Sequence, residues 1–347
     1  MTVVARRLRI PITAAVLLAS TGCSNATPET ASADGDPVSS PAGYPVVIEN
    51  CGEEFTFLAP PERTVVMNGG SVAEVSTMLA LGLGDRIVAN AQNYGISEVE
   101  GRQAEIDALP TGDLDLNDAG DIPREAMLSL RPDFVVSTYD GGFAADLGHA
   151  TRDELRQLGA NSYAPAHSCA GDVAEGTPSI EDSYELITDL ATIFGVEDRA
   201  EEIIQTSRAE IDAVEALVAD AEEPQVLVLF VGMSMGSGGL GDVGATGIWN
   251  DILARAGATN AFASASAGMF ADVSLEQAAD ASIDGVVIVS YQHPDPESEA
   301  HRLFEEFPQW AASRNEDFVV LSDSIYLGPS NAAAVEAIAR MSHPERF

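Results

Sequence analysis

Apolar residues in the first half of the chain gather in short runs that alternate with segments of helical spacing. The short runs are nearly continuous, which is typical of strands buried on both faces of a parallel sheet. Between and after them, apolar residues recur every three or four positions, as on one face of an amphipathic helix. The expected strands are Thr64–Met67, Arg86–Ala91, Phe134–Ser137 and Ser162–Ala164, and the expected helices are Val72–Leu83, Arg124–Leu130 and Arg152–Leu158.

A longer helical pattern follows in residues 180–219. One apolar stripe runs to Phe194, and a second begins at Ile203 after an interruption at Gly195-Val196, while Asp and Glu occupy the other faces. This pattern predicts either one kinked helix or two abutting helices.

The alternation of strands and helices then resumes. The expected strands are Gln225–Val231, Gly285–Ser290 and Phe318–Leu321, and the expected helices are Thr246–Ala256, Leu275–Ala281, Ala300–Phe307 and Ser330–Met341. The whole pattern predicts an α/β protein of two Rossmann-like lobes with mostly parallel sheets, joined by a long α-helix.

The two halves also share a local pattern. In residues 124–137 and again in residues 275–290, a glutamate opens a helix, an aspartate follows eight positions later, and a buried strand begins next. The pairs are Glu125 with Glu276 and Asp133 with Asp284. We interpret the match as a pseudo-repeat, against the alternative of chance, since acidic residues are common at helix starts.

The N-terminal residues have the pattern of an export signal. Three arginines precede the short apolar run Ile10–Ser20, and Thr21-Gly22-Cys23 follows. The run is too short to span a membrane. It predicts a lipoprotein that is cut before Cys23 and lipidated there; the alternative is an ordinary signal with a stray cysteine. The expected segments are a signal peptide (1–22), a disordered tether (23–45), an N-terminal lobe (46–179), a linking helix region (180–219) and a C-terminal lobe (220–347).

Charge and cysteine content narrow the possible partners. The formal net charge is −38 and no lysine is present. Because a strongly negative protein is repelled by nucleic acid and by anionic lipid surfaces, nucleic acid is excluded as a partner, and we expect membrane attachment through the lipid anchor only. Outside the cytoplasm, Cys51 and Cys169 are expected to form one disulfide, with two separate buried thiols as the alternative.

Two glycine-rich motifs follow the strand that ends at Val231. Ser234 stands in a G-x-S-x-G sequence, the motif of a serine hydrolase, but glycines rather than a helix follow it. An α/β serine hydrolase that uses Ser234 therefore stays only as an alternative. The overlapping G-x-G-x-x-G sequence indicates a mobile loop beside the ligand crevice. The histidines show no metal-binding spacing, so neither a metal site nor a cofactor is expected.

Several segments together resemble the class III periplasmic binding proteins, which serve ABC importers of ferric siderophores, haem and cobalamin. Residues 62–67 (ERTVVM), Glu74 and residues 79–89 (LALGLGDRIVA) are similar to the opening of that family. Residues 125–136 (EAMLSLRPDFVV) and 249–262 (WNDILARAGATNAF) are similar to two later elements. The resemblance covers residues 46 to about 342.

The resemblance implies a rigid linking helix and an extracytoplasmic, lipid-anchored, monomeric solute-binding protein that is not an enzyme. It implies delivery of the solute to a permease dimer with its ATPase, and it assigns Glu125 and Glu276 to docking on permease arginines. Ile283-Asp284 replaces the family's frequent Pro-Asp, with no expected functional effect.

The expected cargo is an iron–siderophore complex; cobalamin, haem and a deazaflavin cofactor precursor are alternatives. Aromatic and polar residues at the expected strand ends would line the cleft, although ordinary core packing is the alternative for each. The strand-end loops expected to form the cleft contain no arginine, which favours a neutral or cationic hydroxamate complex over an anionic chelate. These loops are residues 67–71, 92–95, 138–143, 232–241, 268–272, 291–293 and 326–331. The candidate ligand-binding residues are Asn68, Tyr94, Tyr139, Phe143, Met233, Leu240, Phe270, Tyr291 and Tyr326.

Overall fold

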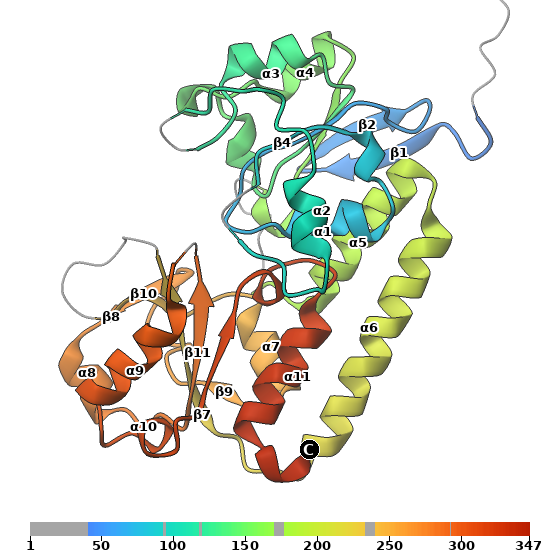
Figure 1. Cartoon of the computed structure of the whole chain (residues 1–347). Helices are drawn as coiled ribbons and strands as arrows, with labels where there is room; N and C mark the ends of the chain where they lie inside the picture. Colours follow the sequence, from blue (N-terminus) through green and yellow to red (C-terminus); the bar gives the residue numbers. More distant parts are fainter. Residues whose placement is uncertain (1–40, 93–94, 118–119, 170–176, 233–239, 292) are drawn as a thin grey trace, which may run out of the picture. The chain divides into compact units, whose positions relative to one another are not determined.

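The computed structural model describes residues 41–92, 95–117, 120–169, 177–232, 240–291 and 293–347. All of these residues belong to one compact unit, residues 40–347. Figure 1 shows two α/β lobes in this unit, with a long helix alongside both. None of the described helices is both long enough and apolar enough to cross a bilayer.

The N-terminal lobe is built on a four-stranded parallel sheet in the order β4-β3-β5-β6. Alternate residues of β3 and β5 point into two apolar clusters. Helices α1 and α5 therefore cover one face of the sheet, and α3 and α4 cover the other. The elements are β3 (Thr64–Val66), β4 (Ile87–Asn90), β5 (Phe134–Val136), β6 (Asn161–Tyr163), α1 (Ala73–Ala80), α2 (Arg102–Asp107), α3 (Arg124–Leu130) and α4 (Arg152–Gln157).

An antiparallel hairpin, which the sequence analysis does not predict, precedes this sheet: β1 (Val46–Asn50) and β2 (Glu53–Phe57). Its turn carries Cys51, whose sulfur lies 2.07 Å from that of Cys169. The structure thus contains the expected disulfide. It ties the hairpin to the segment that follows β6.

The C-terminal lobe has a six-stranded mixed sheet in the order β10-β8-β7-β11-β12, with β9 paired to β7. The parallel strands β7 (Gln225–Val231), β11 (Gly285–Ser290) and β12 (Phe318–Leu321) have the predicted bounds. Strands β8 (Leu240–Gly244) and β10 (Phe270–Val273) are antiparallel and form an edge that the apolar pattern does not reveal. The expectation of a loop throughout the glycine-rich segment is therefore wrong from Leu240 onward.

Helices cover both faces of this second sheet. Helices α7 and α11 share one apolar cluster with β7 and β11, whereas α8, α9 and α10 share another. Their bounds, with that of the short strand β9, are α7 (Trp249–Arg255), β9 (Thr259–Asn260), α8 (Leu275–Asp280), α9 (Pro296–Glu306), α10 (Ala311–Asn315) and α11 (Asn331–Ser342).

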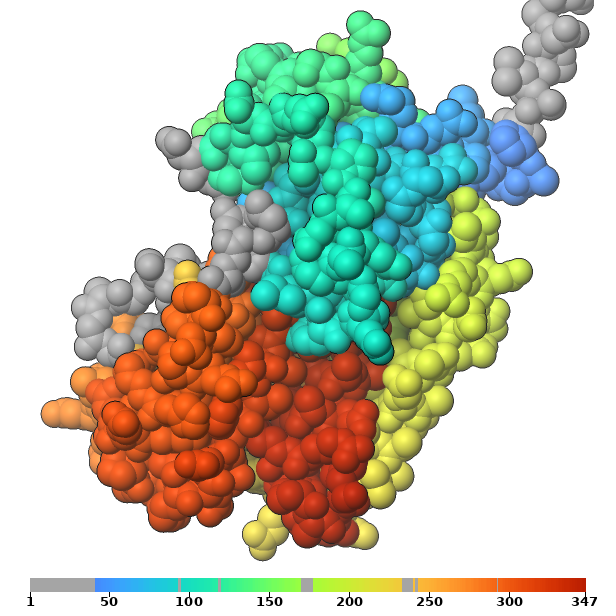
Figure 2. Space-filling model, viewed as in Figure 1, coloured from blue at the N-terminus to red at the C-terminus, as the bar shows by residue number. Residues whose placement is uncertain are grey.

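The linking region consists of two abutting helices, α5 (Ile180–Phe194) and α6 (Glu197–Val218). Gly195 ends α5 with a φ of 69°, a left-handed conformation that glycine adopts without steric cost. One apolar cluster includes buried residues of α5, α6, α1, α7 and α11 and so continues through both lobes. Figure 2 shows the lobes, blue to green and orange to red, in direct contact beside yellow α6.

The pseudo-repeat has a structural counterpart in its two aspartates. The Asp133 carboxylate accepts hydrogen bonds from the backbone N–H groups of Glu62 and Arg63, just before β3. The Asp284 carboxylate accepts one from Gln225 N, at the start of β7. Asp133 thus ties the start of β5 to the start of its neighbour β3, and Asp284 ties the start of β11 to the start of its neighbour β7.

Candidate ligand cleft

A cavity of about 520 Å³ lies between the two lobes. It is bounded by the segments that follow β3, β5, β6, β11 and β12, and by the segments around β8 and β10. The carboxyl ends of parallel strands are the usual place of ligand crevices in α/β proteins. The lining residues are Gly70, Ser71, Ala73, Glu74, Thr138, Tyr139, His167, Ser168, Pro178, Thr246, Gly247, Ile248, Trp249, Met269, Phe270, Tyr291, Tyr326 and Leu327.

Aromatic rings make up the wall on the side of the C-terminal lobe. The Trp249 and Phe270 rings are stacked with their centroids 6.2 Å apart. Both rest on Phe230, each at 5.0 Å, and Tyr326 contacts Phe230 at 6.1 Å. Edge-to-face and stacked contacts of this kind fix ring orientation, so the cleft presents a preformed apolar surface.

Gly247 allows Trp249 to occupy this position. A Cβ atom on Gly247 would lie only 2.4 Å from the Trp249 ring. The indole therefore fills the space beside the backbone at the start of α7. Its Nε1 is buried and has no hydrogen-bond partner among the described residues.

A buried carboxylate lies on the opposite side, on α1. Glu74 is 1% exposed, and its Oε2 accepts hydrogen bonds from Thr138 Oγ1, at 2.9 Å, and from Gln92 Nε2. Burial raises the pKa of Glu74, while the bonds from Gln92 and Thr138 act against that rise. The carboxyl thus connects the loops after β4 and β5 to α1.

Burial favours the neutral forms of three further lining residues, Tyr139, His167 and Tyr326. Burial raises the pKa of Tyr326 and also that of Tyr139, where the charge of Asp121 adds to the effect. Burial lowers the pKa of His167, whose Nδ1 is buried without a hydrogen-bond partner among the described residues. Among the described residues, the lining therefore combines aromatic faces and polar groups with a single carboxyl group.

Four candidate ligand-binding residues line the cavity: Tyr139, Phe270, Tyr291 and Tyr326. Three others, Asn68, Phe143 and Leu240, are not among the described lining residues. The Asn68 amide donates to Gly120 O, Phe143 packs 4.4 Å from the Arg152 guanidinium, and Leu240 belongs to the core of the C-terminal lobe. A position near a strand end does not determine which way a side chain points. Tyr94 and Met233 lie outside the described residues, as do Ser234 and Cys23.

Sequence reasoning missed several lining residues, among them Glu74, Thr138, His167, Trp249 and Met269. For Glu74 the sequence holds a usable indication, because Glu74 is the only charged residue in residues 68–84. Trp249 comes from the start of a helix rather than from a strand end. Thr138 and Met269 fall in two strand-end loops, 138–143 and 268–272, that the sequence analysis expects to form the cleft, whereas His167 carries no such indication.

The two expected docking residues occupy equivalent places. Glu125 and Glu276 are the second residues of α3 and α8, and both are exposed. Glu125 lies 3.3 Å from Arg124 Nη1. Ser274, which precedes α8, accepts a hydrogen bond from Gln277 N, so Glu276 is not needed as the N-cap.

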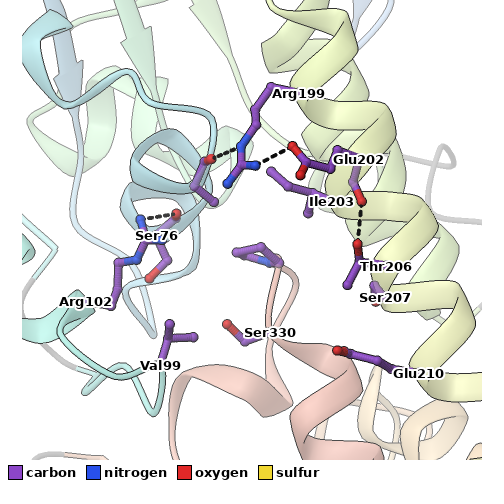
Figure 3. Close-up of a pocket in the computed structure, with 12 residues that line it drawn as sticks. Ser76, Val99, Arg102, Arg199, Glu202, Ile203, Thr206, Ser207, Glu210 and Ser330 are labelled. Carbon is purple, nitrogen blue, oxygen red and sulfur yellow. Dashed lines mark hydrogen bonds and ion pairs between the residues drawn. The ribbon is translucent and has the colours of Figure 1, made fainter.

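A second cavity, of about 330 Å³, lies among α1, α2, α6 and the start of α11 (Figure 3). Its two arginines already have partners. Arg199 donates to Ala80 O and pairs with Glu202, while Arg102 donates to Ser76 O and pairs with Glu105. The inter-lobe cavity is larger and lies at the strand ends. Among the described residues, no group of three or more His, Cys, Asp or Glu is placed to hold a metal ion.

Comparison with known proteins gives a family and several structural neighbours. A family model described as periplasmic binding protein matches residues 65–323. An ABC-type Fe³⁺-hydroxamate transport protein from Saccharomonospora viridis is 27% identical, with a TM-score of 0.68 over 86% of this chain and 99% of that chain. No curated protein matches the chain.

Two further neighbours are similar in fold. A periplasmic binding protein from Veillonella parvula is 20% identical, with a TM-score of 0.70 over 86% of this chain and 97% of that chain. The periplasmic haem-binding protein RhuT from Roseiflexus is 21% identical, with a TM-score of 0.61 over 82% of this chain and 99% of that chain.

Proposed function

The chain belongs to the periplasmic binding protein family, and we propose that it is a lipid-anchored component of an ABC importer whose cargo is a ferric hydroxamate. Proteins of this family are extracytoplasmic, bind solutes and deliver them to ABC permeases; they are not enzymes. The family membership does not itself specify the cargo or the lipid anchor; these two points are what we propose.

The observation that carries the cargo assignment is the charge of the cleft lining. Its described residues include aromatic and phenolic side chains but no arginine, and the chain has no lysine. The internal residues outside the described ranges contain no arginine either. Haem carries propionate carboxylates and catecholate complexes are anionic, so both would favour arginine partners. In a ferric hydroxamate the ligand anions balance the charge of Fe³⁺.

Size and similarity support the same cargo. Sites for small organic ligands typically measure about 300–1,000 Å³, and the cleft falls within that range. The Saccharomonospora viridis protein, named for Fe³⁺-hydroxamate transport, is also the neighbour with the highest identity of the three compared above.

Calorimetric titration of the mature protein tests the cargo directly. We expect saturable binding of a ferric trihydroxamate, and weaker or no binding of a ferric catecholate, haem and cobalamin. Tight binding of haem or cobalamin without binding of the hydroxamate complex would reject the assignment.

The lipid anchor rests on the sequence of the N-terminal residues. A diacylated Cys23 would hold the protein at the membrane, since two acyl chains anchor stably where one binds marginally. Cys23→Ala is expected to release a folded, ligand-binding protein from the membrane fraction. A variant that stays in that fraction would contradict the anchor.

A further inference from the structure

We propose that the cleft selects a cargo carrying a positive charge, and that Glu74 is the residue responsible for this selectivity. The inference rests on the proposed function and narrows its substrate class to cationic ferric hydroxamates, such as those with a free ammonium group.

Glu74 is the only acidic or basic side chain among the described lining residues apart from His167, which is neutral. Its carboxylate has no salt-bridge partner in the described part of the chain. Buried charges in proteins are normally paired, because an unpaired one loses its hydration without compensation. A cation supplied by the ligand would provide the missing partner.

The surroundings of Glu74 favour a cation further. Thr138, which donates to the carboxylate, itself lines the cavity and gives a polar path from Glu74 to a bound ligand. Asp323, buried near Glu74, adds negative potential from the other lobe in its ionised form, while Arg102 lies close enough to Asp323 to act against it. The Tyr326 ring also lines the cavity and is only partly buried, and aromatic rings are suited to cation–π contact.

Glu74 also has a structural role, since it joins Gln92 and Thr138 to α1. The two roles predict different results. A purely structural role affects all cargoes alike, whereas charge selection affects only the cationic one. The test therefore compares two ligands of nearly the same shape.

The experiment uses a linear ferric trihydroxamate with a free terminal ammonium group and the same complex after N-acetylation, which is neutral. We expect wild-type protein to bind the ammonium form about tenfold more tightly, as for one charge-assisted hydrogen bond. In Glu74→Gln the charge-assisted bond is lost, so the ratio of the affinities for the ammonium and acetylated complexes should fall to about one. The affinity for the neutral, acetylated complex should be retained.

Two further variants complete the test. Glu74→Asp keeps the negative charge and should keep a preference for the ammonium form. This variant still tests the inference if Glu74→Gln fails to fold. Asp189→Asn removes another partly buried carboxylate, one that accepts from Tyr163 and does not line the cavity, and should leave the ratio unchanged.

Equal affinity of the wild type for both complexes would overturn the charge selection but leave the proposed function standing. An equal loss of both affinities in Glu74→Gln would assign Glu74 to a structural role and also overturn the inference. Failure of the wild type to bind either complex would overturn the proposed cargo, and this inference with it.

Discussion

The Asp323 carboxyl belongs to the C-terminal lobe and contacts the N-terminal lobe. It is 2% exposed and its Oδ2 accepts a hydrogen bond from Ser76 Oγ at 3.0 Å. Burial, and next the charge of Glu98, raise the pKa of Asp323 from 3.8 to about 7. Because the folded state binds this proton more tightly than the unfolded state, the contribution of Asp323 is most favourable below about pH 4 and declines up to about pH 7.

Asp323→Asn should remove this dependence. We expect the unfolding free energy of the variant to exceed that of the wild type by about 4 kcal/mol at pH 8, and by much less at pH 4. Chemical denaturation at the two pH values measures the difference. The exposed Asp280→Asn serves as the control, and a gap for Asp323→Asn that is the same at both pH values would show that Asp323 does not titrate as described.

Individual residues of the site were only partly predictable from the sequence. The strand-end rule places Tyr139, Tyr291 and Tyr326 in the cleft, because chain direction fixes where those segments lie. The same rule fails for Phe143, which packs against Arg152. It also fails to find Trp249, whose position depends on the missing side chain of Gly247. These outcomes depend on tertiary contacts that a local pattern does not contain.

At the scale of elements, periodicity succeeded where strands are buried on both faces. Strands β7, β11 and β12 have the predicted bounds because their near-continuous apolar runs end at polar or glycine residues. The pattern failed for β8 and β10, which are paired at an edge and interrupted by glycine and polar residues. The hairpin β1–β2 was missed for a similar reason, since only some of its residues are buried.

The helices α3 and α8 carry the docking proposal. Glu125 and Glu276 occupy the second position of each helix, one in each lobe. A glutamate there interacts favourably with the helix dipole, worth about 0.3–1 kcal/mol. We propose that both carboxylates also pair with permease arginines through charge-assisted hydrogen bonds.

Charge reversal at both positions separates these two roles. Glu125→Arg with Glu276→Arg should cost about 0.6–2 kcal/mol of stability and keep cargo affinity, but abolish cargo uptake and cargo-stimulated ATP hydrolysis by the importer. Glu201→Arg with Glu305→Arg changes the net charge equally at exposed positions and should leave uptake normal. Uptake at the wild-type rate in Glu125→Arg with Glu276→Arg would reject the docking role and leave only the interaction of the two glutamates with the helix dipoles.

At the scale of the whole molecule, hydrogen bonds and apolar packing hold the two lobes together. Glu98 accepts hydrogen bonds from Ser322 N, Ser324 N and Ser324 Oγ across the lobes. A continuous apolar cluster joins α5 and α6 to both sheets. Opening the cleft widely would break these contacts, so the structure favours a cargo that enters a largely preformed site.

The central claim is that a ferric hydroxamate binds in the inter-lobe cleft, and the two tryptophans allow a direct test. Both are buried, but Trp249 lines the cleft, whereas Trp310 packs inside the C-terminal lobe with its ring 4.3 Å from that of Phe307. In Trp310→Phe, where Trp249 alone emits, a ferric trihydroxamate should quench fluorescence strongly and saturably. In Trp249→Phe the remaining emission should change far less. Saturable quenching of equal size in both variants, or none in Trp310→Phe, would contradict binding in this cleft.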